Sequence, residues 1–396
     1  MANSGSCAGS EERTMEGKVS LDDKKDFSSA ESDADLYIEN ESELKDLCIK
    51  NMAFGNKLTP NDIHITRLGH AMTNHVYKVK IARCDPSMPL NLILKISTPY
   101  TSTIYDKGLQ DEVSEVLGSA RCGPRILSNF SCGMIQEYID GHPLDFDLCL
   151  NISTLTSIAS EVGKFHRRAT AAAPSHWNRT PILWRKIDGW IPIARRMVSD
   201  NSLDIDIEGI AECCNSFRKI LDNHIKLSNS PSNTILFCHN DLCGKNIIRT
   251  AHGIRLIDFD YSGFNYAGSD IAKFFSEIST RYHGVYPYVS IYDSLDVDHE
   301  IKVMFISIYL SEVLGKNVPP SDKLVEEFIT SLQIHILGIT LFWCLWGITM
   351  AERPESELSV EKDAFLHCAR YRYKYYKDNA RKLLEAGIIP GSLENQ

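Results

Sequence analysis

The sequence predicts an α+β fold with a small β-rich part and a larger, mainly helical part, and three observations predict it. Short apolar runs typical of strands are concentrated between residues 63 and 139. Longer runs with helical periodicity follow, over 152–168 and 334–350. A strand–loop–strand pattern over 236–257 carries closely spaced polar residues. With 396 residues, 43% of them hydrophobic, the chain can bury a sizeable core in one two-lobed protein or two domains.

The first part of the chain predicts a tail, a helix and a hairpin, in that order. Residues 1–35 are rich in Ser, Glu, Asp and Lys and contain few apolar residues, which predicts a disordered tail. Between Leu36 and Met52 the pattern is helical, with Leu44, Leu47 and Cys48 on one face. The next stretch alternates around a short polar turn and predicts a hairpin over residues 63 to 81.

Two more strands and a helix are predicted before residue 140. The strand over 92–96 contains a single cation, Lys95, and a lysine in such a run either reaches solvent or meets an anion. The helix after it carries Glu112 and Glu115, three positions apart on neighbouring faces. A strand over 134–139 then leads into a turn.

The polar stretch in the middle of the chain predicts a hairpin that carries candidate catalytic residues. Residues 236–238 enter a loop with Asp241 and Asn246, and the chain turns back through 250–253 to bring up Asp258. Three oxygen-bearing side chains can then converge on one hard cation. In phosphoryl transfer of the protein-kinase-like class, one Asp accepts the hydroxyl proton while an Asn and a second Asp hold Mg²⁺. The alternative is an ordinary hairpin with capping residues, but the second acid inside an apolar run favours phosphoryl transfer.

This part of the chain resembles the choline/ethanolamine kinase family. The resemblance starts at His239, runs through Asn246 and continues over Leu256–Tyr266, Asp270–Ala272 and Phe275–Glu277. Weaker similarity extends over most of the chain after the expected tail.

The resemblance implies a protein-kinase-like two-lobed fold that uses ATP and Mg²⁺ to phosphorylate a small cationic amino alcohol. A nucleotide-binding N-lobe would span 36–140, and a C-lobe over 141–396 would hold the catalytic and substrate-binding residues. The catalytic base would be Asp241, and the metal ligands would be Asn246 and Asp258.

The resemblance also implies that the hairpin covers the nucleotide phosphates. Thr73 and Asn74 would lie in its turn, although this sequence keeps only Gly69 of the two glycines usual in the family. An ordinary edge hairpin is the alternative. Lys95 stands where most choline kinases carry an arginine, and it would contact the phosphates.

In the kinase template the strand lysine also pairs with a helix glutamate. Glu112 is slightly favoured over Glu115 for that role, and the sequence does not choose between them. Gln136 and Tyr138 belong to the strand that leads into the expected hinge, where backbone groups would meet adenine.

The acceptor side of the site must bind one cation and one hydroxyl, which needs aromatic faces or carboxylates and a nearby base. Two tryptophans, Trp343 and Trp346, lie three apart in an apolar run, a spacing typical of core residues. They also resemble the family's aromatic substrate wall. Tyr371 lies where the spacing departs from the family. The residues expected to bind the acceptor are Asp260, Tyr261, Glu277, Trp343, Trp346 and Tyr371.

Two stretches, 181–186 and 242–248, resemble ethanolamine kinases more than choline kinases. An ammonium can also donate to Asp260 or Glu277, whereas a trimethylammonium cannot donate at all. We therefore expect phosphorylation of ethanolamine to phosphoethanolamine, the first step of phosphatidylethanolamine synthesis. Choline kinase activity or dual specificity is the alternative, and a kinase of the aminoglycoside phosphotransferase type is a more distant one. The complete acid–amide–acid set disfavours a catalytically dead binding module.

Composition disfavours several other classes of protein. The chain has 42 Lys and Arg against 52 Asp and Glu, a formal net charge of −10, which disfavours nucleic-acid and anionic-membrane partners. Its 12 cysteines form no C-x-x-C pair and no apolar signal region opens the chain, which favours a reducing, cytoplasmic location. The apolar run 334–350 is short for a membrane span, so we expect a buried helix and no integral membrane span. Because family members are often dimers, the resemblance adds a homodimer as an expectation.

Overall fold

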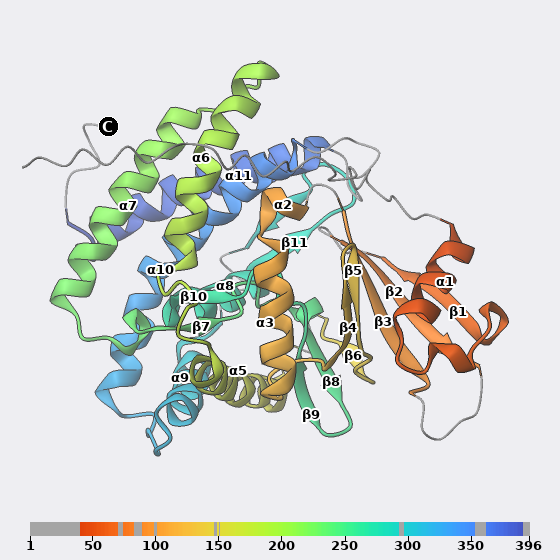
Figure 1. The fold of residues 1–396 in the computed structure, drawn as a ribbon. Helices are drawn as coiled ribbons and strands as arrows, with labels where there is room; N and C mark the ends of the chain where they lie inside the picture. Colours follow the sequence, from red (N-terminus) through yellow and green to blue (C-terminus); the bar gives the residue numbers. More distant parts are fainter. Residues whose placement is uncertain are drawn as a thin grey trace, which may run out of the picture. The chain divides into compact units, whose positions relative to one another are not determined.

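A computed structural model describes residues 40–69, 74–82, 89–98, 101–145, 149, 151–292, 297–352 and 362–390. The expected tail and Thr73 lie outside these residues. All of the described residues belong to one unit, Ile38–Gln396. Within it, a small antiparallel sheet lies beside a larger set of helices (Figure 1). The expected α+β fold is therefore confirmed.

A five-stranded antiparallel sheet forms the β-rich part. Its elements are β1 Ile63–Leu68, β2 Asn74–Ile81, β3 Asn91–Ser97, β4 Ile126–Phe130 and β5 Gly133–Glu137, with helices α1 Glu41–Asn51, α2 Thr101–Ile104 and α3 Lys107–Ser119. The strands lie in the order β1-β2-β3-β5-β4. Of the three α1 residues expected to share a face, Leu44 and Cys48 are buried in the core of this sheet, and Leu47 is partly buried against it. Helix α3 lies between the sheet and the larger helices (Figure 1).

The helical part is organised around one long helix. Its helices are α5 Ile152–Ala172, α6 Ile182–Asp200, α7 Ile207–Leu227, α8 Ala267–Ser279, α9 His299–Leu314, α10 Lys323–Met350 and α11 Lys362–Glu385. Helix α10 packs against α6, α7, α8, α9 and α11. It is long and apolar enough to cross a membrane, but 83% of its most apolar window is buried inside the protein. The expectation of a buried helix in this run is therefore confirmed.

The polar loop is framed by short strands. These are β6 His142–Pro143, β7 Ile235–Cys238, β8 Ile247–Thr250, β9 Gly253–Leu256 and β10 Gly263–Tyr266, with the 3-10 turn η4 Gly244–Asn246. Strands β8 and β9 pair antiparallel, with Ile247 opposite Leu256, as the expected hairpin requires. Strand β7 pairs with β10, and β6 joins the edge of β8. The loop that carries Asp241 therefore leaves β7 and enters η4 and β8.

Two connections contain regular structure of their own. Residues 281–300, whose Tyr-, Asp- and His-rich composition predicts a long loop, contain part of a two-stranded ribbon formed by β11 Thr280–Tyr282 and β12 Val289–Ile291. Residues 196–232, whose pattern predicts a helical connection, are mainly helical and hold the end of α6 and all of α7. Asp206 caps α7 by accepting from the Gly209 N–H at 2.9 Å. The remaining 3-10 turns are η1 Gly55–Lys57, η2 Pro60–Asp62 and η3 Pro231–Asn233.

Candidate active site

The loop after β7 is held by one buried carboxylate, Asp270 of α8. Its two oxygens accept the backbone N–H groups of His239 at 2.7 Å and Asn240 at 2.8 Å. His166 Nε2 lies 2.9 Å from the same carboxylate, and His166 Nδ1 lies 2.7 Å from the Tyr309 hydroxyl. His166 is fully buried and has partners at both ring nitrogens, as expected of a structural histidine. These contacts fix the backbone immediately before Asp241.

Asn240 gives the loop its sharp turn. Its φ of 66° is in the left-handed region, which Asn tolerates better than most residues. The side chain holds the turn by donating to the carbonyls of Tyr261 at 2.9 Å and Gly263 at 3.1 Å. Asn265 in turn donates to Asn240 Oδ1 at 2.8 Å. Unusual backbone conformations that the surroundings over-determine in this way are frequent at functional sites.

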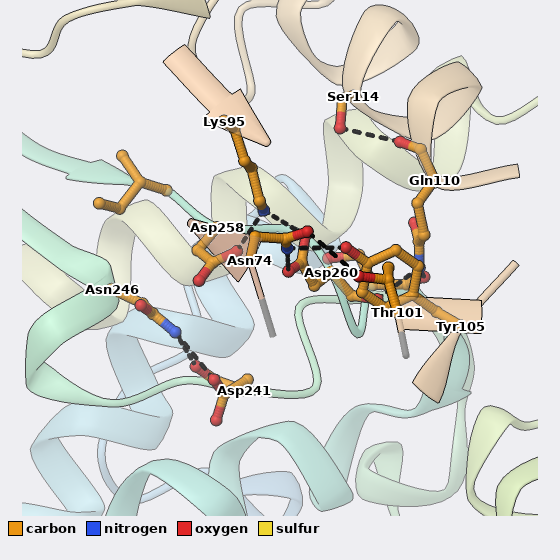
Figure 2. A network of polar contacts seen from close by, with 12 residues as sticks. Asn74, Lys95, Thr101, Tyr105, Gln110, Ser114, Asp241, Asn246, Asp258 and Asp260 are labelled. Atoms are coloured by element: carbon orange, nitrogen blue, oxygen red, sulfur yellow. Dashed lines mark hydrogen bonds and ion pairs between the residues drawn. The ribbon is translucent and has the colours of Figure 1, made fainter. Parts of the chain in front are cut away.

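The structure brings Asp241 and Asn246 into direct contact. The Asn246 amide donates to Asp241 Oδ2 at 2.9 Å and to the Asp241 carbonyl at 3.0 Å (Figure 2). Asp258 follows β9 and has a φ of 64°. Asn246 and Asp258 line the same cavity, and their role as ligands of one cation stays a prediction. The expected ligands for a hard metal ion therefore lie together.

Lys95 extends from β3 to two carboxylates beyond the sheet. Its Nζ donates to Asp258 Oδ1 at 3.0 Å and makes a second, shorter contact with Asp260 Oδ1 (Figure 2). Burial alone would lower the pKa of Lys95, but Asp258 and Asp260 hold it well above its ordinary value. Burial would raise the pKa of Asp258, yet the ammonium of Lys95 outweighs it and lowers that pKa. The lysine therefore stays charged and keeps Asp258 ionised.

The expected pairing of Lys95 with Glu112 or Glu115 is wrong for the described residues. Glu112 lies 3.0 Å from His176, and Glu115 accepts from Asn129 at 2.6 Å. The reason is the phase of α3, because successive residues are about 100° apart around a helix. The helix turns Gln110 toward the site instead.

Asp260 belongs to the network around Lys95 and not to the aromatic wall. Besides Lys95, its carboxylate accepts from the Asn74 amide at 2.7 Å, and the same amide donates to the Tyr105 hydroxyl at 2.7 Å (Figure 2). Gln110 donates to the Asp260 carbonyl at 2.7 Å. Asn74 and Asp260 are both buried. This placement contradicts the expected contact of Asp260 with the acceptor cation, because both of its oxygens serve groups on the β3 side.

A cavity lies between the sheet and the segment that follows β9. It holds about 660 Å³ of empty space, a figure that includes its open mouth. Gln136 and Lys95 line it from the sheet. Tyr138 is not among the lining residues in the described part of the chain, and Lys78 Nζ lies 4.1 Å from its ring centroid. The apolar lining comes from Leu68, Val76, Ile93, Pro124, Ile126, Met134, Ile257 and Phe259.

The expected aromatic wall is present on the other side of Asp241. The Tyr261 and Trp343 ring centroids are 5.4 Å apart, and those of Trp343 and Trp346 are 5.2 Å apart. The Trp346 indole N–H donates to the Tyr261 hydroxyl at 2.6 Å. Tyr261 and Trp343 belong to the hydrophobic core cluster and Trp346 packs against it, which confirms the core interpretation. Their role as a substrate wall stays a prediction.

Sequence reasoning missed a buried lysine at the centre of this wall. Lys273 of α8 donates to Glu277 Oε1 at 2.6 Å and lies 3.3 Å from Asp241 Oδ1. Its Nζ is 4.4 Å from the Trp343 ring centroid. The available signal was a lone cation inside an apolar helix, four residues before an acid.

The ionisation of this cluster follows from burial and charge. Burial raises the pKa of Asp241, and the nearby Lys273 only partly offsets it. Burial would also raise the pKa of Glu277, but Lys273 and Arg372 outweigh it and lower that pKa. Burial would lower the pKa of Lys273, which the carboxylates of Glu277 and Asp241 instead raise. The pKa values of the two carboxylates, Asp241 and Glu277, are thus shifted in opposite directions.

The expected place of Tyr371 in the wall is wrong. Its hydroxyl accepts from the Ile291 N–H at 3.1 Å, on β12. The next residue of α11, Arg372, is buried and lies 4.0 Å from Glu277, and it donates to the Tyr282 hydroxyl at 2.9 Å. A shift of one position along α11 changes which side chain faces the site, and the rotation of the helix about its axis cannot be predicted from the sequence alone.

Comparison with known proteins decides the family. The model of the choline/ethanolamine kinase family matches residues 65–377. The chain belongs to this family. The kinase is 26% identical to a probable choline kinase of Arabidopsis thaliana over 82% of this chain and 88% of that protein. It is 24% identical to an ethanolamine kinase of Homo sapiens over 80% of this chain and 76% of that protein.

A solved structure gives the same answer for the fold. The crystal structure of a choline kinase from Cryptosporidium parvum superposes with a TM-score of 0.77 at 26% identity, covering 89% of this kinase and 98% of that chain. The expected protein-kinase-like fold is confirmed. Because relatives of both kinds appear, family membership leaves open the choice between choline and ethanolamine.

Proposed function

We propose that this kinase transfers the γ-phosphoryl group of ATP to the hydroxyl of a small amino alcohol and prefers ethanolamine to choline. The observation that carries the proposal is the position of Asp241. It contacts Asn246, which lines the cavity with Lys95 and Asp258, and it contacts Lys273, which lies against Trp343. The carboxylate thus stands between a cavity suited to a nucleotide and an aromatic wall suited to an amine.

The nucleotide would occupy the cavity, with Gln136 on its wall near the expected hinge. Asn246 and Asp258 offer the oxygen ligands that Mg²⁺ prefers, and the metal would neutralise charge on the phosphates. Lys95 supplies a permanent positive charge at the same end. Tyr138 would act through its backbone if it meets adenine. Thr73 remains a proposed phosphate contact, and Asn74 would act by holding Asp260 against Lys95.

Asp241 would accept the proton of the acceptor hydroxyl. Its raised pKa makes it a stronger base than an exposed aspartate. The Asn246 amide, at 2.9 Å, would orient the carboxylate. An acceptor held between Trp343 and Glu277 would present its hydroxyl to this base.

Hydrogen bonding supports the preference for ethanolamine. A primary ammonium, that of Lys273, already donates to Glu277 at 2.6 Å beside the Trp343 ring. A trimethylammonium cannot donate, so a carboxylate arranged for donation would lose its partner. Choline remains the second candidate because Tyr261 and Trp343 offer faces for cation–π contact.

Steady-state kinetics with ethanolamine, choline and an aminoglycoside on one preparation test the proposal. We expect the highest kcat/KM for ethanolamine. Faster turnover of choline would overturn the preference and leave amino-alcohol kinase activity standing. Phosphorylation of the aminoglycoside alone would overturn both.

We further propose that the enzyme works in the cytoplasm, where its product would enter phosphatidylethanolamine synthesis. The ten cysteines that the structure describes are free thiols, which supports a reducing compartment. A homodimer is expected from the resemblance, and sedimentation of the full chain would test it.

A further inference from the structure

A resident ammonium lies among the groups assigned to the acceptor. Lys273 Nζ contacts Glu277 at 2.6 Å, Asp241 at 3.3 Å and the Trp343 ring at 4.4 Å from its centroid. Under the proposed function, Glu277 and Trp343 receive the acceptor's cation and Asp241 receives its hydroxyl proton. Lys273 is itself only 4% exposed. Its ammonium therefore occupies the environment that the substrate's ammonium needs.

The charges of the cluster are already balanced. Two cations, Lys273 and Arg372, face two carboxylates, Asp241 and Glu277. An incoming cation finds no surplus negative charge among these four groups while Lys273 stays in place. Like charges in a partly desolvated site repel one another strongly. The acceptor must therefore displace the Lys273 ammonium or bind against it.

We propose that Lys273 is a specificity-determining residue that occupies the cation subsite and discriminates against quaternary ammonium acceptors. This inference rests on the proposed function. Ethanolamine can replace Lys273 like for like, because its ammonium donates to Glu277 and lies on Trp343 in the same way. Choline can supply the charge and the ring contact but leaves the carboxylate without a hydrogen bond. A buried carboxylate that loses its hydrogen-bond donor costs binding free energy, so the exchange favours the primary amine.

A purely structural role is the competing explanation. Lys273 and Glu277 are four residues apart on a helix, where ion pairs stabilise the helix modestly. A structural pair would affect both amines alike. Lys107 provides a matched control, because it forms an ion pair with Asp111, also four residues along the same helix, α3.

The experiment compares the full-length wild type with Lys273→Ala, Lys273→Gln, Lys273→Arg and Lys107→Ala. Choline and ethanolamine binding is measured by titration calorimetry, and kcat and KM are measured for each amine. We expect Lys273→Ala to bind choline at least tenfold more tightly. The KM for choline should fall, and kcat should stay the same. Lys273→Gln, which removes the charge but can still donate to Glu277, should show the same direction. Lys273→Arg and Lys107→Ala should keep the wild-type ratio of the two amines.

The outcomes separate this inference from the proposed function. A wild-type ratio of choline to ethanolamine affinity in both Lys273→Ala and Lys273→Gln would overturn the role of Lys273, whatever the enzyme phosphorylates. If Lys273→Ala is unfolded by circular dichroism, Lys273→Gln decides alone. If the wild type phosphorylates neither amine, the proposed function fails, while the calorimetric comparison still decides whether Lys273 excludes a quaternary ammonium. Absence of choline binding in every variant would also overturn the inference.

Discussion

Two lysines, the partly buried Lys95 and the buried Lys273, stand on either side of the Asp241 loop, and each is paired with two carboxylates. Lys95 meets Asp258 and Asp260, and Lys273 meets Asp241 and Glu277. In both cases the carboxylates more than offset burial and raise the pKa of the lysine. The surroundings differ. Lys95 borders the cavity that would receive anionic phosphates, whereas Lys273 lies against an aromatic ring that would receive a cation.

One arrangement of charges, a lysine between two carboxylates, can therefore have opposite effects on the binding of an anionic and of a cationic ligand. A fixed cation helps where the ligand is an anion, so Lys95 would add to binding. A fixed cation competes where the ligand is a cation, so Lys273 would select among the amines that bind. The first role follows from the kinase template, and the second emerges only from the packing of α8 against α10.

The largest effect is expected at Asp241, which joins the two clusters. Asp241→Asn should lower kcat roughly a hundredfold to ten-thousandfold, the usual worth of a positioned base, with little change in the KM for ATP. The variant should fold normally, because Asn removes a carboxylate whose pKa burial raises. Stopped assays and thermal melts measure both quantities. Near-normal turnover would exclude Asp241 as the base.

Removing a metal ligand should have the next largest effect. Asp258→Ala should weaken Mg²⁺-dependent nucleotide binding by more than roughly tenfold, since even a supporting residue at a metal site can be worth that much. Calorimetry with and without Mg²⁺ measures it. Amine binding at the Lys273 cluster should stay unchanged, and unaltered Mg·ATP binding would remove Asp258 from the metal site.

The acid stability of the two clusters should separate them. A carboxylate with a lowered pKa stabilises the fold above its unfolded pKa, and that stability is lost as pH falls through the folded pKa. Lys95→Met removes the group that lowers the pKa of Asp258, so acid unfolding should begin at a higher pH. Lys273→Met should shift the pH of acid unfolding less, because Arg372 still lowers the pKa of Glu277. Circular dichroism during acid titration compares the variants, and equal shifts would contradict this difference.

The smallest effect is expected at Glu112. Its partner in the described structure is His176, and exposed ion pairs contribute only about 0–1 kcal/mol. Glu112→Gln should therefore change the KM for ATP by less than about twofold. Lys95→Met serves as the positive control in the same assay. A large loss of ATP affinity in Glu112→Gln would mean that α3 rotates to bring this residue to Lys95 when nucleotide binds.

The sequence was most informative where chemistry demands fixed spacing. Asp241 and Asn246 share a loop, and the hairpin formed by β8 and β9 returns the chain to Asp258, so their proximity could be predicted from local pattern. The strand containing Lys95 was equally clear. The same reasoning could not supply the partners of Lys95, because they depend on contacts between residues more than 160 positions apart.

Helix phase and tertiary packing explain what the sequence did not reveal. Gln110 replaces Glu112 at the site, and Arg372 replaces Tyr371, because a shift of one or two positions moves a side chain to another face. Lys273 was missed since a lysine four residues before a glutamate is usual on an exposed helix. Only the burial of α8 beneath α10 distinguishes it.

The single carboxylate of Asp270 has a kinetic consequence for the free enzyme. Because it accepts hydrogen bonds from two successive backbone N–H groups in a buried position, the protein's own groups hold the backbone before Asp241. Binding energy then need not be spent on immobilising that loop, and the ordering entropy is lost during folding and not during each turnover. In hydrogen–deuterium exchange, the amides of His239 and Asn240 should be among the slowest in the protein before nucleotide or amine is added.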